Sequence, residues 1–273
     1  MNLASKKEIQ GFLKEKGIRP FKGLGQNFLV NEKDLEKIVQ AAQLKKEDKV
    51  IEVGPGLGVL TQELVKEAKE VIAVEKDAKL ASFLKENLKA TNLKVLSEDA
   101  LKSPTLKEEI QDQYKVVANL PYYITSPVIR FFLEVKKQPE LMVLLIQKEV
   151  AQRICASPGQ MSILAVAVQV YSRPSIVDHI SRSSFWPQPK VDSAILKIQP
   201  KELTDIDFSH FFKIVRLGFS EKRKQLANNL AKGLCLKKDK IASILKEINL
   251  NEKIRAQELS VEDWQKLSEK IKS

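Results

Sequence analysis

The residues with the most specific chemistry lie at 119–123, where Asn-Leu-Pro-Tyr-Tyr directly follows the apolar run at 114–118. The amide oxygen of Asn119 can accept a hydrogen bond from an exocyclic amine without taking a proton. The adjacent aromatic rings offer a planar base a surface for stacking. This combination at the end of a buried strand suits a nucleobase amine as substrate, although a Pro-Tyr turn that merely ends a strand has the same composition.

A second chemical signal is the glycine-rich turn at 54–58, which reads Gly-Pro-Gly-Leu-Gly. It lies between a buried strand pattern and a helical pattern, where glycines let the backbone approach a ligand closely. Val59 stands where the dinucleotide fingerprint G-x-G-x-x-G has its last glycine. The turn therefore predicts a ligand site but disfavours a nicotinamide cofactor.

Two acidic residues follow the next two apolar runs along the chain. The run at 71–74 ends in Glu75, which is placed to accept hydrogen bonds from ribose hydroxyls, and the run at 93–96 leads to Asp99. The Asp99 carboxylate could accept a hydrogen bond from the amine of a bound adenine. Either acid, taken alone, is most simply explained as a solvated carboxylate on the surface. Together with the glycine turn and Asn119, they predict a nucleoside site where four strands end.

The elements that position these residues follow from the hydrophobic periodicity. Strands are predicted at 49–53, 70–75, 93–97, 114–119, 140–146, 175–179 and 191–198. Helices are predicted at 34–42, 60–68, 78–89, 125–136 and 148–156, and then at 208–219, 222–232, 238–248 and 261–271. The alternation predicts an α/β fold with a doubly wound, mostly parallel seven-stranded sheet, followed by a small all-helical domain. We divide the chain into a basic arm at 1–25 with a short helix near 9–13, a domain at 26–201 and a helical domain at 202–273.

The formal net charge of +11 is concentrated at the two ends of the chain. Residues 1–25 carry six basic and two acidic side chains, and residues 201–273 carry 16 basic and 11 acidic side chains. Basic flanks attract a phosphate backbone, although a single lysine run also serves solubility alone. The strongest candidate for an RNA contact is the run Lys222, Arg223 and Lys224 beside an amphipathic helix.

The sequence offers little to a metal ion or a membrane. It has two cysteines and two histidines without zinc or iron spacing, so we expect no metal site. Two lone cysteines are typical of a reducing compartment. The apolar runs are too short to span a bilayer, and the N-terminal residues lack the apolar core of a signal peptide. We therefore expect a cytoplasmic protein.

The order of these motifs resembles that of the ribosomal RNA adenine dimethyltransferases. The blocks that carry the resemblance are residues 26–29, 52–61, Glu75, Asp99, 119–125, 185–193 and 218–226, so it extends from about residue 23 nearly to the end. The related erythromycin-resistance methylases usually carry Lys and His where this chain has Leu57 and Val59. That difference favours the small-subunit branch of the family.

The resemblance implies an activity, a fold and a partner. The implied reaction transfers methyl groups from S-adenosylmethionine to N6 of two adjacent adenosines in a 3′-terminal hairpin of small-subunit ribosomal RNA. The product is N6,N6-dimethyladenosine, and the step belongs to small-subunit biogenesis. The implied fold is a Rossmann-like class I methyltransferase with an antiparallel hairpin at the end of its sheet and an RNA-binding helical domain. The expected partner is the small ribosomal subunit with its RNA, and the enzyme is expected to act as a monomer.

The groups also suggest a role for each residue at the target base. Asn119 and the backbone carbonyl of Leu120 would accept the two N–H bonds of the target amine, and Pro121 would fix the direction of that carbonyl. Tyr122 would stack on the extruded base, with Phe185 as the candidate for its opposite face. The residues expected to bind the cofactor are Asn27, Leu29, Gly54, Gly56, Glu75, Asp99 and Asn119.

Two further residues at the motifs have expected roles. Glu52, at the end of a strand pattern, either stands behind the methionyl amine of the cofactor or is structural. Tyr123 is expected to pack within the protein rather than to contact substrate.

Three other functions remain open at this stage. The first is a large-subunit RNA methylase of the erythromycin-resistance type, from which this chain differs at Leu57 and Val59. The second is a non-catalytic ribosome-assembly or transcription factor on the same fold, against which the intact motif residues argue. The third is a DNA adenine methylase, for which an acidic Asp-Pro-Pro-Tyr motif and a larger recognition domain would be expected.

Overall fold

The computed structural model describes residue 11 and residues 27–202 and 206–271. The expected basic arm and its short helix near 9–13 therefore lie, apart from Gly11, outside the described residues. The described chain forms two compact units. One falls within Met1–Ala151 and Pro174–Pro200, and the other within Gln152–Arg173 and Lys201–Ser273.

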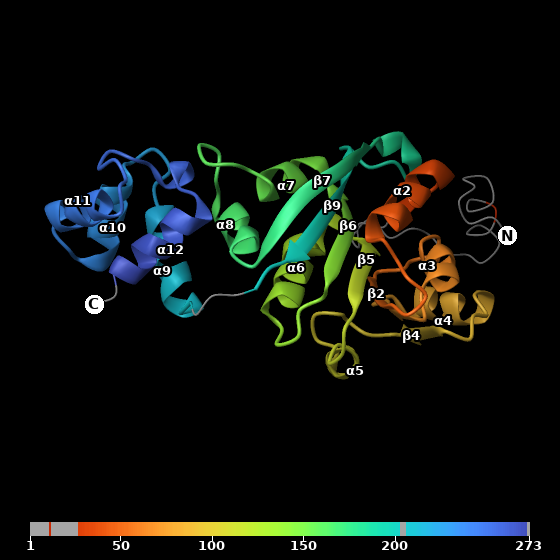
Figure 1. The fold of residues 1–273 in the computed structure, drawn as a ribbon. Coiled ribbons are helices and arrows are strands. Elements are labelled where there is room, and N and C mark those ends of the chain that lie inside the picture. The colour runs from red at the N-terminus through yellow and green to blue at the C-terminus, as the bar shows by residue number, and fades with distance from the viewer. Residues whose placement is uncertain (1–10, 12–26, 203–205, 272–273) are drawn as a thin grey trace. The chain divides into compact units, whose positions relative to one another are not determined.

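The first unit is built on a mixed seven-stranded sheet in the order β4-β3-β2-β5-β6-β9-β7 (Figure 1). The strands in that order are β4 (Leu93–Leu96), β3 (Glu70–Val74), β2 (Lys49–Val53), β5 (Lys115–Asn119), β6 (Leu141–Gln147), β9 (Ser193–Pro200) and β7 (Ser172–Ile180). Strands β2 to β6 pair in parallel, whereas β9 is antiparallel to β6. The predicted mostly parallel seven-stranded sheet is confirmed. Its chain order reverses between β2 and β5, and ligands bind at such a switch point in open α/β sheets.

Helices cover the sheet because its central strands are apolar on both faces. All six residues from Leu141 to Ile146 in β6 are buried, as expected of a strand covered on both sides. The helices are α2 (Glu32–Ala42), α3 (Thr61–Glu67), α4 (Ala78–Asn87), α5 (Pro104–Glu109), α6 (Thr125–Glu134) and α7 (Lys148–Ile154). Figure 1 shows α2, α3 and α4 on one side of the sheet and α5 and α6 on the other.

A small second sheet, which the sequence did not predict, joins two distant segments. Strand β1 (Phe28–Leu29) pairs antiparallel with β8 (Phe185–Trp186), so that Leu29 lies opposite Phe185. The 3-10 turn η3 (Arg182–Ser184) precedes β8. The backbone N–H of Val30 donates to the Ser184 carbonyl at 2.8 Å, and the Ser184 hydroxyl donates to Asp34 of α2 at 2.6 Å. These contacts bring the N-terminal motif beside the predicted base-stacking residue.

The second unit is helical. It contains α8 (Ile163–Gln169), α9 (Phe208–Gly218), α10 (Leu226–Leu234), α11 (Lys238–Glu247), η4 (Ala256–Glu258) and α12 (Val261–Lys270). Helix α9 packs against α8, α10 and α12. Residues 152–173 thus belong to the same unit as the C-terminal helices. The predicted boundary at residue 202 placed them in the first domain instead. The assignment of separate catalytic and RNA-binding roles to two domains stays a prediction.

The basic run at 222–224 lies on a turn rather than in a helix. The helix predicted at 222–232 begins only at Leu226, and Lys222, Arg223 and Lys224 are exposed in the turn before it. The buried Asn229 amide donates to the carbonyls of Gly218 at 2.6 Å and Glu221 at 3.1 Å. This side chain holds the backbone that leaves α9, and α10 starts after the turn is complete.

Candidate active site

A cavity of about 350 Å³ lies where β2, β3 and β5 end, at the carboxyl edge of the sheet. The sequence-predicted residues that line it are Asn27, Leu29, Gly54, Gly56, Glu75, Asp99, Asn119, Leu120, Pro121, Tyr122 and Phe185. The structure thus brings together the residues predicted for the base and the cofactor, whose individual roles stay predictions. The predicted RNA-binding residues at 222–224 are in the other unit and do not line this cavity.

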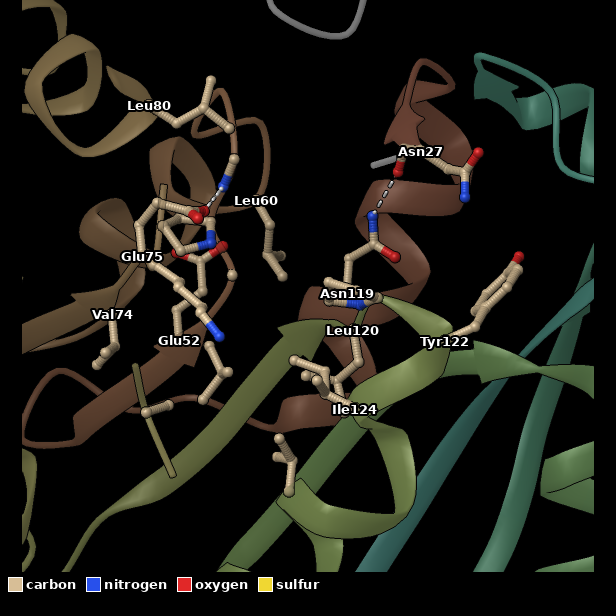
Figure 2. A pocket seen from close by; sticks show the side chains of 18 of the residues that line it. Asn27, Glu52, Leu60, Val74, Glu75, Leu80, Asn119, Leu120, Tyr122 and Ile124 are labelled. Carbon is tan, nitrogen blue, oxygen red and sulfur yellow. Dashed lines mark hydrogen bonds between the residues drawn. The ribbon is translucent and has the colours of Figure 1, made fainter. Parts of the chain in front are cut away.

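Asn119 is the last residue of β5, and its amide has a defined orientation. Its Nδ2 donates a hydrogen bond to the backbone carbonyl of Asn27 at 3.2 Å. Figure 2 shows the Asn119 side-chain oxygen directed toward the side of the pocket where Tyr122 lies. Since the nitrogen serves Asn27, the oxygen is the atom that the pocket can use as an acceptor. The Asn27 contact could not be read from the sequence, because the two residues are far apart along the chain.

The turn after Asn119 is held in place by backbone and side-chain contacts. The Leu120 N–H donates to the Leu145 carbonyl of β6 at 3.1 Å, and Pro121 leads into the 3-10 turn η2 (Tyr122–Ile124). The Tyr122 hydroxyl is hydrogen-bonded to the Ser193 hydroxyl at 2.9 Å. Burial raises the pKa of the Tyr122 phenol, so the ring is neutral at physiological pH.

The two aromatic residues that flank this turn differ in exposure. Phe185 is buried, with 3% of its surface exposed, and it lines the same cavity as Tyr122. Tyr123, which was expected to pack within the protein, is 52% exposed and also lines the cavity. The expectation was wrong because η2 turns this ring outward, and the sequence does not show the direction of a ring on a 3-10 turn.

The glycine turn after β2 has the backbone conformation that only glycine adopts readily. Gly54 has φ +70° and Gly56 has φ +59°, both in the left-handed region. A Cβ atom on Gly56 would lie 3.1 Å from Cε1 of Phe28. The Gly56 N–H donates to Oε2 of Glu75 at 3.0 Å (Figure 2), so the turn and the acid are fixed together.

The two predicted acids are both oriented by further contacts. Oε1 of Glu75 accepts a hydrogen bond from the Asp77 N–H at 2.9 Å. Asp99 accepts from the Leu101 N–H at 3.1 Å and forms an ion pair with Lys76 at 2.9 Å. The hydrogen bond from Lys76 is the main reason that the pKa of Asp99 is lowered. Lys76 was not predicted for the site, and its position directly after Glu75 at a strand end was the available signal.

Glu52 lies beneath the pocket and is almost fully buried, with 1% exposure. The Thr61 hydroxyl donates to its Oε2 at 2.6 Å. Burial is the largest cause of a pKa raised to about 8, and the nearby Glu75 adds to it while Thr61 opposes it. The carboxyl group is therefore mostly protonated at neutral pH, and it can ionise when a cation comes close.

Neither a metal centre nor a membrane segment is evident in the part of the chain that the structure describes. Within it, no three His, Cys, Asp or Glu side chains are grouped so that they could hold a metal ion. None of the described helices is both long and apolar enough to cross a membrane.

The sheet order, the antiparallel strand β9 beside β6 and the pocket at the carboxyl edge define a Rossmann-like class I methyltransferase. The model of the family described as ribosomal RNA adenine dimethylase matches residues 20–273. The chain belongs to this family. It is accordingly an enzyme that transfers methyl groups from a donor to adenines of ribosomal RNA.

The chain is similar to a curated relative and to two solved structures. It is 47% identical over 257 residues to ribosomal RNA small subunit methyltransferase A of Dehalococcoides mccartyi, covering 92% of this chain and 88% of that protein. A dimethyladenosine transferase of Plasmodium falciparum superposes with a TM-score of 0.74 at 31% identity, covering 87% of this chain and 94% of that one. The 23S rRNA methyltransferase ErmE superposes with a TM-score of 0.72 at 25% identity, covering 90% and 100%.

Proposed function

We propose that the protein uses S-adenosylmethionine to methylate N6 of two adjacent adenosines in a 3′-terminal hairpin of small-subunit ribosomal RNA. The product is N6,N6-dimethyladenosine, formed during biogenesis of the subunit in the cytoplasm by a monomeric enzyme. The observation that carries the proposal is the Asn119 amide, whose nitrogen is held by the Asn27 carbonyl at 3.2 Å. Its oxygen is thereby left to accept a hydrogen bond in the pocket. The 47% identical relative named as a small-subunit methyltransferase supports the choice of RNA.

The cofactor side of the pocket fits a nucleoside that carries an amino-acid tail. Gly54 and Gly56 carry no side chain and adopt positive φ angles, so a ligand can meet their backbone directly. The oriented Glu75 carboxylate suits vicinal ribose hydroxyls, and Asp99 suits an adenine amine. Asn27 and Leu29, on the β1 side of the pocket, would close over the cofactor. When bound, S-adenosylmethionine supplies a methyl group on a positively charged sulfur, which needs no further activation.

The residues at the base would align a poor nucleophile. The lone pair of adenine N6 is delocalised into the ring, so acceptors at both N–H bonds favour the pyramidal nitrogen that can attack. Asn119 and the Leu120 carbonyl are proposed as those acceptors, with Pro121 fixing the carbonyl. A strong base is not needed, because the nitrogen becomes acidic only after the methyl group has moved. Most of the rate then comes from positioning the base between Tyr122 and Phe185.

The exposed turn at 222–224 is proposed to contact the phosphate backbone of the RNA. All three of its side chains are basic and exposed, and the turn is held from below by Asn229. Contacts of this kind supply affinity without reading sequence, and they weaken with rising salt.

A large-subunit substrate is the alternative that the similarity to ErmE raises. Leu57 and Val59, the two positions that separate the branches, are 0% and 7% exposed here. They pack in the apolar core beneath the turn, where a lysine would have to bury its charge. The apolar identities of these two residues, where the resistance-type methylases usually carry Lys and His, favour the small-subunit branch.

The decisive test supplies labelled S-adenosylmethionine with three acceptors: unmethylated small subunits, large subunits and DNA. We expect label only in the small-subunit RNA, recovered as N6,N6-dimethyladenosine. Label in large-subunit RNA would replace the proposal with the alternative. No label on any acceptor, despite cofactor binding, would indicate a non-catalytic assembly or transcription role.

A further inference from the structure

The hydrogen bond between Tyr122 and Ser193 links the proposed base-stacking ring to the rigid part of the sheet. The two hydroxyl oxygens are 2.9 Å apart. Ser193 is fully buried, with 0% exposure, although it is a polar residue. A buried hydroxyl needs a partner, and the hydroxyl of Tyr122 provides it.

The backbone of Ser193 cannot move easily. It is the first residue of β9 and lies opposite Gln147 at the end of β6. The preceding carbonyl of Asp192 accepts a hydrogen bond from the Lys148 N–H at 3.0 Å, and the Asp192 side chain accepts from the Arg182 N–H at 3.0 Å. The Ser193 hydroxyl is therefore presented from a fixed point.

Tyr122 is held at both ends as a consequence. Its backbone lies in the short turn η2 directly after Pro121, and its phenol oxygen is bound to Ser193. The neighbouring Tyr123, which shares the turn, is 52% exposed. An aromatic ring fixed at its backbone and at its far edge is a rigid surface, which is what alignment of a base requires.

We propose that Ser193 is a positioning residue that holds the Tyr122 ring as the fixed face against which the target adenine is placed. This inference rests on the proposed function, because the ring has a positioning role only if the target base stacks on it. A fixed ring matters most in the second methyl transfer, to the monomethylated amine. The monomethylated amine has one N–H left for hydrogen bonding, so the ring contributes a larger share of its alignment.

The test compares the full-length wild type with Ser193→Ala, Tyr122→Phe and the double variant, on unmethylated small subunits. Either single change removes the same neutral hydrogen bond, so we expect kcat to fall about tenfold in each. The fraction of product that stops at N6-methyladenosine should rise, and the KM for S-adenosylmethionine should stay unchanged. The double variant should be no slower than the singles, since both remove one interaction.

Ser172→Ala is the matched control. Ser172 is also a buried serine at the start of a strand, 2% exposed, and its hydroxyl donates to the Val168 carbonyl at 2.8 Å. Its loss should lower the melting temperature about as much as Ser193→Ala, but it should leave the product ratio unchanged. If Ser193→Ala does not fold, Tyr122→Phe decides alone, because it keeps the ring and removes the same bond.

Three results would overturn the inference: wild-type kcat and product ratio in the single variants, multiplied losses in the double variant, or the same product shift in Ser172→Ala. A wild type that forms no N6,N6-dimethyladenosine would overturn the proposed function, and the inference with it. The wild-type arm therefore separates the two failures.

Discussion

At the scale of single residues, the pocket places neutral acceptors at one end and acids at the other. The Asn119 amide is oriented by its hydrogen bond to the Asn27 carbonyl, whereas the Glu75 carboxylate is oriented by the hydrogen bond from the Gly56 N–H. A neutral amide oxygen accepts a hydrogen bond from an amine without taking its proton. A carboxylate is suited to the hydroxyl and amine donors of a cofactor. The two ends thus have different chemistry within one cavity, as a two-substrate transfer requires.

Glu52 should make the stability of the protein depend on pH. Its pKa is raised to about 8 in the folded state, from 4.5 for an ordinary Glu. The folded state therefore keeps a proton that the unfolded chain loses, so this contribution to stability is full below pH 4.5 and falls as the pH rises toward 8. Glu52→Gln keeps the neutral form at every pH. In urea unfolding from pH 5 to 8, the free energy of unfolding of the variant should rise relative to that of the wild type by up to about 1 kcal/mol per pH unit. A constant difference across this range would contradict the buried, protonated carboxyl.

The identities of the pocket residues could be predicted from the sequence, but their partners could not. Gly54, Glu75, Asp99 and Asn119 stand at strand ends, and parallel strands bring their carboxyl ends to one edge. The partners Asn27 for Asn119, Lys76 for Asp99 and Ser193 for Tyr122 depend on side-chain directions and on the β1–β8 pairing. No periodicity in the chain encodes those directions.

At the scale of elements, the short segments decide the geometry of the site. The sheet and its longer helices follow the hydrophobic periodicity, so they could be predicted. Strands β1 and β8 have two residues each, which is too short for a periodic signal. Helix α8 reads Ile-Leu-Ala-Val-Ala-Val-Gln, a composition typical of a strand, and it is helical because Ser162 caps it and it packs against α9.

The glycine turn should not tolerate a side chain at Gly56. In Gly56→Ala the new Cβ would meet the Phe28 ring at 3.1 Å on a residue with φ +59°. Either the turn or β1 must shift, which disturbs the hydrogen bond to Glu75. We expect the Kd for S-adenosylmethionine to rise at least about tenfold, measured by calorimetry, since roughly 1 kcal/mol of left-handed strain adds to the clash.

Gly159→Ala is the control for the backbone strain alone. Gly159 has φ +101°, but nothing lies within 4 Å of its Cβ position. That variant should lose stability and keep its affinity for the cofactor. Equal affinities in both variants and the wild type would show that the turn does not meet the cofactor.

At the scale of the whole molecule, the chemistry and the basic turn belong to different compact units. All residues that line the pocket belong to the first unit, and Lys222, Arg223 and Lys224 belong to the second. The proposed catalytic alignment and the proposed RNA contact should therefore respond to separate substitutions. This division predicts that substitutions on the turn alter binding to the subunit and leave cofactor binding intact.

Lys224→Ala should weaken binding to small subunits and make it less dependent on salt. One lost phosphate contact should lower the slope of log affinity against log salt by about 0.7 to 0.9. Lys69→Ala removes the same charge from an exposed residue that precedes β3, at the opposite edge of the sheet from the pocket, and should keep the wild-type slope. Filter binding over a range of potassium concentrations measures both. An unchanged slope for Lys224→Ala would place the RNA elsewhere.

The most direct single measurement is the rate of one methyl transfer to small-subunit RNA in the variant Asn119→Ala. Loss of a preorganised hydrogen-bonding group from such a site typically costs about 10² to 10³ in rate, so we expect a loss of that size when S-adenosylmethionine is saturating. Asn92→Ala is the control, because its amide also donates to backbone carbonyls, those of Val65 and Ala68, outside the pocket. A normal rate in the control and a loss in Asn119→Ala would establish the amide as the group that holds the target amine. Transfer by Asn119→Ala within a few fold of the wild type would contradict it.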